Sequence, residues 1–244
     1  MPENLFSHCP NTPSGPSLHP PSKEFWMGTD DLGIDLFAQI ARGTRTSLII
    51  GFGVATVSIF FAVAVGCYSG LYGGKKDQYL MRLVDLFMTV PELPTMIVLG
   101  AFFGPSIINI IIVLSVFSWV RPTRIFRARV ISIKEEGYIK MAKGYGGGFF
   151  YILKEHLLSD MYPLIAINYI RLMSRAVVAE ASLSFLGLGD PTSKSWGLIL
   201  NHAMGFQGIY FTSYWKWWVV FPLAFMILFV LCLSILSREV EEWL

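Results

Sequence analysis

Two long stretches of the chain hold no charged residue, and apolar side chains dominate both. They are residues 46–74 and 217–237. The hydrocarbon core of a bilayer is about 30 Å thick, and about 20 apolar helical residues cross it. Helices of soluble proteins average about 11 to 12 residues, so two buried soluble helices are a poor alternative. The pattern therefore predicts membrane-spanning helices over 47–72 and 217–237.

The second predicted span is interrupted by proline. Residues 78–103 are interpreted as one tilted helix bent at Pro91, because neighbouring helices can satisfy the backbone groups that a proline frees. An alternative joins 93–120 into one helix and leaves 78–90 on the membrane surface. The first interpretation is preferred, since the alternative puts a Gly-Pro pair at the centre of a span.

The remaining segments complete the domain organisation. A third span over 106–130 continues as a basic helix, and a fourth covers 161–188. A polar loop over 131–160 separates them. Residues 1–27 are rich in proline and are expected to form an extended tail ahead of a transmembrane domain over 28–244. The expected fold class is all-α, a polytopic transmembrane helical bundle.

Composition narrows the class of protein. Of the 244 residues, 54 % are hydrophobic and 15 % are charged, against about 25 % charged in an average soluble domain. A disordered chain is excluded. Basic and acidic residues number 19 and 17, so no net field remains to hold a nucleic acid. The 3 cysteines cannot form a disulfide framework, and His8, Cys9 and His19 are too loosely spaced to predict a metal site.

Positive charge divides unevenly between the two ends of the predicted helices. Twelve lysines and arginines fall on the side of the 131–160 loop, and five fall on the other side. Loops rich in lysine and arginine stay in the cytoplasm. We therefore expect a plasma (inner) membrane protein with its C-terminus and this loop in the cytoplasm and its N-terminal tail outside.

Three stretches of the chain form distinctive motifs: GTDDLGID at 28–35, GYIKMAKGYG at 137–146 and EASLSFLGLG at 180–189. Together they resemble the second permease subunit of the dipeptide/oligopeptide/nickel family of ABC importers. In the loop motif, Lys140 and Met141 stand where the family has glutamate and alanine, whereas Ala142 and Gly146 match. The resemblance implies the type I ABC importer permease fold. Family members begin with one more span, which this sequence is expected to lack.

The resemblance implies that the chain forms half of the membrane pore of an ATP-driven importer of di- or oligopeptides. The loop would form a coupling helix that docks on an ATPase subunit. The residues expected at this contact are Tyr138, Lys140, Met141, Ala142, Tyr145 and Gly146. Their aromatic and apolar members recur at helical spacing and share one face, and the glycine would end the helix.

The chain itself carries no recognisable reaction chemistry. It lacks the G-x-x-x-x-G-K-[ST] phosphate loop and any nucleophile–base–acid set, so neither enzyme activity nor a bound cofactor is expected. The resemblance implies two ATP-binding partner subunits that hold ATP and magnesium. It adds a second homologous permease subunit and an extracytoplasmic substrate-binding protein. Structural roles are implied for the motif residues Gly28, Thr29, Asp30, Gly33, Gly187 and Gly189.

Three charged residues inside the fourth predicted span are candidates for the pore lining: Arg171, Arg175 and Glu180. Charges within a span are costly and usually face a cavity or a partner. The arginines could meet a peptide carboxylate, or pair with an acid such as Glu180, Asp85 or Glu92. Alternatively, they reach to the cytoplasmic surface or form an ion pair inside the bundle.

Two other functions stay open at this stage. The same type of ATP-driven importer could carry nickel or another small solute, because an external binding protein largely selects the cargo in this family. A secondary transporter or a non-transporting membrane scaffold is the second alternative. The former should show an internal repeat, and none is visible. A scaffold would not need a docking loop.

Overall fold

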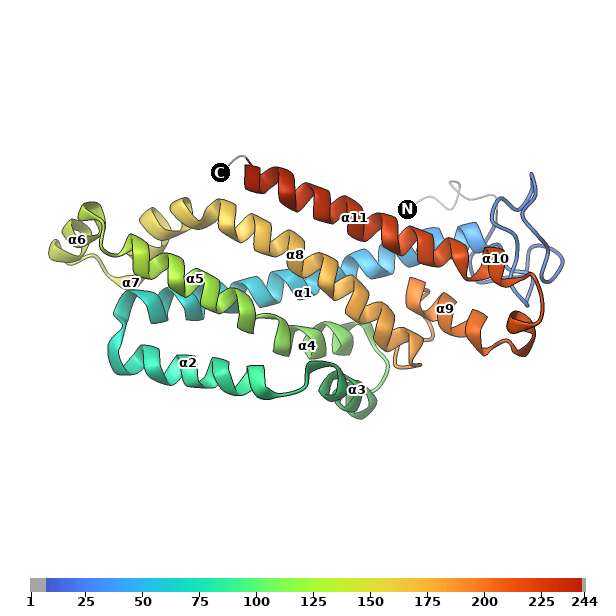
Figure 1. Cartoon of the computed structure of the whole chain (residues 1–244), viewed down its shortest axis with the longest axis horizontal. Coiled ribbons are helices and arrows are strands. Elements are labelled where there is room, and N and C mark those ends of the chain that lie inside the picture. Colours follow the sequence, from blue (N-terminus) through green and yellow to red (C-terminus); the bar gives the residue numbers. More distant parts are fainter. Residues whose placement is uncertain (1–7, 243–244) are drawn as a thin grey trace. The chain divides into compact units, whose positions relative to one another are not determined.

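The computed structural model describes residues 8–242, and within that part of the chain the secondary structure is helical apart from one isolated bridge between Thr29 and Asp35 (Figure 1). The long elements are α1 (Leu36–Tyr72), α2 (Gly74–Thr89), α3 (Glu92–Phe103), α4 (Ile107–Ser118), α5 (Val120–Ile133), α8 (Leu158–Phe185) and α11 (Val220–Glu242). The short ones are α6 (Gly137–Gly144), α7 (Phe149–Ile152), α9 (Trp196–Gly205) and α10 (Trp215–Trp218), with a π turn at Leu153–Leu157 and a 3₁₀ turn at Gln207–Tyr210.

The chain divides into two compact units. The first comprises the chain up to Gly51, Ile97–Ile111 and Ser174–Cys232. The second comprises Phe52–Met96, Ile112–Met173 and the chain from Leu233 onward. Helices α1, α8 and α11 each contribute one part to each unit.

The first unit is built on a tryptophan-rich core. Helix α9 begins at a serine cap, where the side chain of Ser195 accepts a hydrogen bond from the backbone N–H of Leu198. The buried Trp196 that follows donates its indole N–H to the carbonyl of Ile40 at 3.1 Å. The core comprises Leu36, Ile40, Val177, Trp196, Ile199, Ala203, Ile209, Trp217 and Trp218. Aromatic area of this kind is the main source of burial energy in a core.

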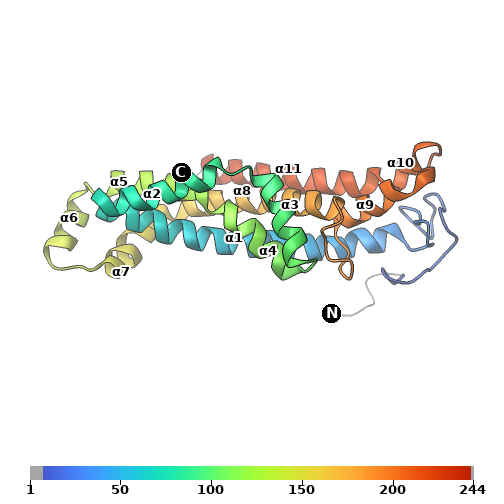
Figure 2. The same cartoon turned by 90° about the horizontal axis from the view of Figure 1, so that it is seen from below.

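The second unit depends on small residues and one bidentate ion pair. A Cβ at Gly66 would lie 2.8 Å from the carbonyl oxygen of Thr123, so glycine is needed for α1 to approach α5. Asp77 on α2 accepts two hydrogen bonds from Arg127 on α5, both of 2.6 Å. The two helices lie side by side in both views (Figures 1 and 2).

The first and last predicted spans correspond to long helical segments. Within the described residues, Leu36–Tyr72 and Trp215–Glu242 are long and apolar enough to cross a membrane. Both extend beyond the expected limits of 47–72 and 217–237. Helix α8 covers most of the fourth expected span but is not among the helices found long and apolar enough to cross, so its crossing stays a prediction.

The middle of the chain is more broken than expected. Helices α2 and α3 meet at 85°, so the single helix expected over 78–103, bent at Pro91, is two helices separated at that proline. Val90 is extended because the following Pro91 disfavours a helical conformation before it. The alternative of one helix over 93–120 is wrong as well, since α3 ends at Phe103 and α4 begins at Ile107. Helices α4 and α5 are bent by 44°.

Candidate functional site

The expected coupling segment forms a short, exposed amphipathic helix. Helix α6 buries Ile139 completely on one side. On its other side, Tyr138, Met141 and Tyr145 are 45 %, 61 % and 85 % exposed. In the second unit, α6 projects past the end of α5 where the chain turns toward α7 (Figures 1 and 2). Exposed apolar side chains gathered on one projecting helix are typical of a protein contact surface.

Gly146 ends this helix as the sequence predicts. Its φ is +83°, a conformation that glycine adopts at little cost. Its N–H donates to the carbonyl of Lys143 at 3.0 Å, and the N–H of Gly147 donates to the carbonyl of Ala142 at 2.9 Å. These two bonds make a Schellman motif, which satisfies carbonyls that the last helical turn would leave without donors.

The polar side of the coupling segment is held by an ion pair. Lys140, where the resemblance places a glutamate, lies 3.1 Å from a carboxylate oxygen of Glu135. This hydrogen bond from Lys140, with the charge of the same lysine, lowers the pKa of Glu135. Both side chains are well exposed, so the pair orients Lys140 more than it stabilises the fold.

Glu180 is enclosed inside the first unit and not open to solvent. Its side chain is buried, with 1 % exposure of the residue. One carboxylate oxygen accepts a hydrogen bond from Ser184 at 2.6 Å, and the other accepts one from Ser47 on α1 at 3.2 Å. Glu180 therefore ties α8 to α1, and its pore-lining role stays a prediction.

The glycines that follow Glu180 complete the same motif. Gly187 has a φ of +83°. Its N–H donates to Ser184, and the N–H of Leu188 donates to Leu183, both at 3.0 Å, which closes α8 with a second Schellman motif. A Cβ at Gly189 would lie 2.4 Å from the hydroxyl of Ser184, so a larger residue would displace the partner of Glu180.

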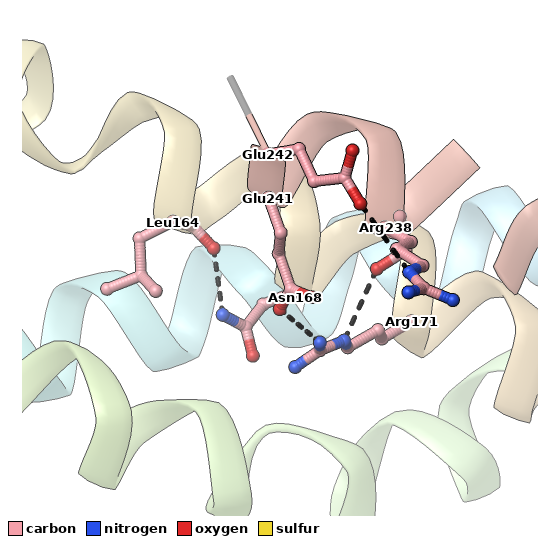
Figure 3. A network of polar contacts seen from close by, with 7 residues as sticks. Leu164, Asn168, Arg171, Arg238, Glu241 and Glu242 are labelled. Atoms are coloured by element: carbon pink, nitrogen blue, oxygen red, sulfur yellow. Dashed lines mark hydrogen bonds and ion pairs between the residues drawn. The ribbon is translucent and has the colours of Figure 1, made fainter. Parts of the chain in front are cut away.

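Arg171 pairs with the C-terminal end of α11 (Figure 3). Its Nε donates to the hydroxyl of Ser237 at 3.3 Å, and its Nη2 bonds the carboxylate of Glu241. The acids suggested from sequence are not its partners, because Asp85 is instead bonded to Arg124. Arg171 therefore forms an ion pair in which both side chains are about half exposed, and a role for it in lining the pore stays a prediction.

Arg175 differs from Arg171. It is exposed, and among the described residues it has no ion-pair partner. A role for it in lining the pore stays a prediction.

The first motif forms a compact turn ahead of α1. Asp30 accepts hydrogen bonds from the backbone N–H of Ile34 at 2.8 Å and from the side chain of Gln39 at 2.7 Å. Thr29 donates to the carbonyl of Pro16 at 2.6 Å. Gly28 and Gly33 have φ values of +77° and +74°, which only glycine adopts readily. These contacts are structural.

The histidines of the N-terminal tail have protein partners. His8 Nδ1 lies 3.1 Å from a carboxylate oxygen of Asp35, and the ring of His8 stacks on that of Phe25 at 4.9 Å. Over residues 8–242, no three His, Cys, Asp or Glu side chains gather closely enough to hold a metal ion.

Comparison with known proteins identifies the family to which this chain belongs. Residues 58–244 match the family described as the inner membrane component of binding-protein-dependent transport systems. The chain belongs to this family. It is therefore an ABC importer permease subunit in the membrane, and the secondary-transporter and scaffold alternatives are wrong.

Relatives of the permease carry peptide-transport names. It is 33 % identical over 208 residues to the oligopeptide transport system permease protein OppC of Bacillus subtilis. The aligned region covers 85 % of this chain and 67 % of OppC. It is 32 % identical over 224 residues to the dipeptide transport system permease protein DppC of the same organism, covering 91 % of this chain and 69 % of DppC.

The fold of the permease is also found among solved structures. An inward-facing crystal form of the MetNI methionine ABC transporter aligns with a TM-score of 0.63 at 16 % identity. The alignment covers 83 % of this chain and 96 % of that chain. At this identity the likeness concerns the fold alone, and it confirms the expected permease fold.

Proposed function

We propose that this permease forms half of the translocation pore of a peptide importer and is coupled to an ATPase subunit through residues 137–149. The single observation that carries the proposal is α6, a helix that projects from the second unit with Tyr138, Met141 and Tyr145 exposed. Burying these side chains against a partner would remove apolar surface from water, at about 25 cal/mol for each Å².

The energy for transport would come from that partner. No phosphate-binding loop occurs in the sequence, so ATP and magnesium would be held by two ATPase subunits. Movement of the ATPases would be transmitted through α6 and would bias the pore between outward and inward access. A second permease subunit would form the other half of the pore, and an extracytoplasmic binding protein would deliver the cargo.

Peptides are the proposed cargo. The two relatives named above are permeases of an oligopeptide and a dipeptide system. Nickel or another small solute remains the alternative cargo, and no contact among the described residues favours it.

The charge distribution supports the proposed orientation. Twelve lysines and arginines fall at the end of the predicted spans where α6 lies, and five fall at the opposite end. The coupling segment and the C-terminus would then lie in the cytoplasm, where the ATPases are, and the N-terminal segment would lie outside.

Disruption of the exposed face of α6 tests the coupling. The variant Met141→Glu places a charge where the contact is proposed to be apolar, and it should greatly reduce co-purification of the ATPase subunits. Phe211→Glu is a matched control, because Phe211 is 91 % exposed in the other unit. If both variants retain the ATPases equally, α6 is not the coupling helix.

A further inference from the structure

The second unit contains a small cavity, open to the surface, that no motif accounts for. Its volume is about 180 Å³. Pockets for drug-sized ligands measure about 300 to 1,000 Å³, so this one suits a molecule of dipeptide size or smaller. It is lined by Phe87, Met88, Val90, Glu92, Phe117, Val120 and Arg121.

Two helix breaks meet at this cavity. Pro91 separates α2 from α3, and its ring nitrogen cannot donate to the carbonyl of Phe87. Pro122, in the first turn of α5, cannot donate to Ser118 at the bend after α4. Breaks of this kind are tolerated at membrane depth where the freed backbone lines a cavity or is covered by protein.

Two opposite charges line the cavity without partners. Neither Glu92 nor Arg121 forms an ion pair or hydrogen bond with any side chain in residues 8–242. Nearby acids on α2 differ, since Asp77 is held by Arg127 and Asp85 is bonded to another arginine of α5. Both residues are exposed, so each charged group is accessible to a small molecule at this site.

Aromatic side chains lie beside these charges. The rings of Phe87 and Phe117 meet edge to face with centroids 6.1 Å apart, and Phe87 meets Trp119 in the same way at 5.7 Å. The cavity therefore combines an acid, a base and an apolar wall. A molecule that carries a cation, an anion and a small side chain would match all three.

We propose that this cavity is a subsite for a short zwitterionic peptide on its way through the pore. Glu92 binds the peptide ammonium group, Arg121 binds its carboxylate, and the peptide side chain contacts Phe87 and Phe117. The inference rests on the proposed function, because it names the chemical class of cargo that the pore accepts. A peptide blocked at either end loses one of the two charged contacts.

Binding of capped peptides to the assembled complex tests the subsite. The complex of two permeases and two ATPases in nanodiscs is given radiolabelled Ala-Ala, N-acetyl-Ala-Ala or Ala-Ala amide, without the binding protein. A hydrogen bond to a charged group is worth about 1.5 to 3 kcal/mol. Wild type should therefore bind Ala-Ala about tenfold or more tightly than either capped peptide.

The variants should separate the two ends of the peptide. Arg121→Gln should lose the preference for the free carboxylate and keep the preference for the free amine, and Glu92→Gln should do the reverse. Arg121→Lys should keep both preferences. Exposed charges away from the cavity supply the controls, and Lys75→Gln and Glu239→Gln should behave as wild type.

Each ratio is taken within one variant, so a loss of folded protein cancels. Equal weakening of all three peptides, or unchanged preferences in both variants, overturns the subsite. Uptake of Ala-Ala by the wild-type complex with ATP and binding protein is measured separately. If uptake occurs while the preferences fail, the subsite is wrong and the proposed function stands. If no peptide is taken up while another solute is, the proposed cargo itself is wrong.

Discussion

Replacing Gly146 with alanine should weaken binding of the ATPase subunit to the permease without affecting insertion of the permease into the membrane. Gly146 closes α6 with a φ of +83°. No heavy atom lies within 4 Å of the position that a Cβ would take, so the substitution adds backbone strain and no steric clash. The effect should therefore be confined to the end of the coupling helix.

The magnitude follows from that conformation. A residue with a Cβ costs about 1 to 2 kcal/mol more than glycine in the left-handed region. If the ATPase binds only the closed helix end, affinity falls by at most about five- to thirtyfold. Gly144 offers a matched control, because its Cβ would also meet nothing within 4 Å, while its backbone is helical. Alanine there favours the helix by about 1 kcal/mol.

The assay compares the two variants directly. Permease in nanodiscs is titrated with purified ATPase subunits, and the dissociation constants of wild type, Gly146→Ala and Gly144→Ala are measured. The amount of each variant in the membrane fraction serves as the insertion control. We expect weaker binding for Gly146→Ala only, with equal insertion of all three proteins.

Two results would refute this reasoning. If Gly144→Ala weakens binding as much as Gly146→Ala does, the backbone at Gly146 is not the cause. If Gly146→Ala reduces insertion and ATPase binding in parallel, the glycine supports folding of the whole chain and has no special part in docking.

Two further substitutions test the packing and electrostatics of the first unit. A Cβ at Gly197 would lie 2.3 Å from the carbonyl oxygen of Ala181. Gly197→Ala should therefore lower the thermal unfolding midpoint by an amount that corresponds to about 1 to 3 kcal/mol. Gly205→Ala is the control and should leave the midpoint unchanged, because a Cβ there would meet no atom within 4 Å. Burial, followed by the charge of Lys194, lowers the pKa of His202 below its usual 6.5. The unfolded chain then binds a proton first, so stability should fall as pH drops below about 6.5. In His202→Gln this loss should be smaller, and an identical pH dependence of the unfolding midpoint would contradict it.

The helix of the proposed coupling segment was predictable because its determinants are local. The spacing of Tyr138, Met141 and Tyr145 predicts one helix face, and Gly146 predicts the helix end. Both depend on residues within two turns of each other, and the structure has the helix at Gly137–Gly144. The break at Pro91 was equally visible, but its angle was not, because neighbouring helices set the direction of the chain after a proline.

The partners of the charged residues could not be predicted. The sequence offers Glu180, Asp85 and Glu92 as possible partners of Arg171, yet the structure pairs Arg171 with Glu241 at the C-terminal end of α11. Ser47 lies 133 residues from Glu180, and no pattern in either segment indicates their contact. A serine in an apolar run is ordinary in sequence, and only helix packing turns it into a donor for a buried carboxylate.

By itself, the sequence determined the class of protein, its two longest apolar helices and the short helix over 137–144. Transfer of apolar side chains into lipid and the backbone freedom of glycine act over short stretches, so they can be read one segment at a time. Tertiary structure alone decided which charges are paired and which are left open. Asp77 and Glu92 are both acids of the α2–α3 region, but only the first meets an arginine side chain. Glu92 at the start of α3 and Arg121 at the start of α5 line the same pocket, and their meeting depends on long-range packing.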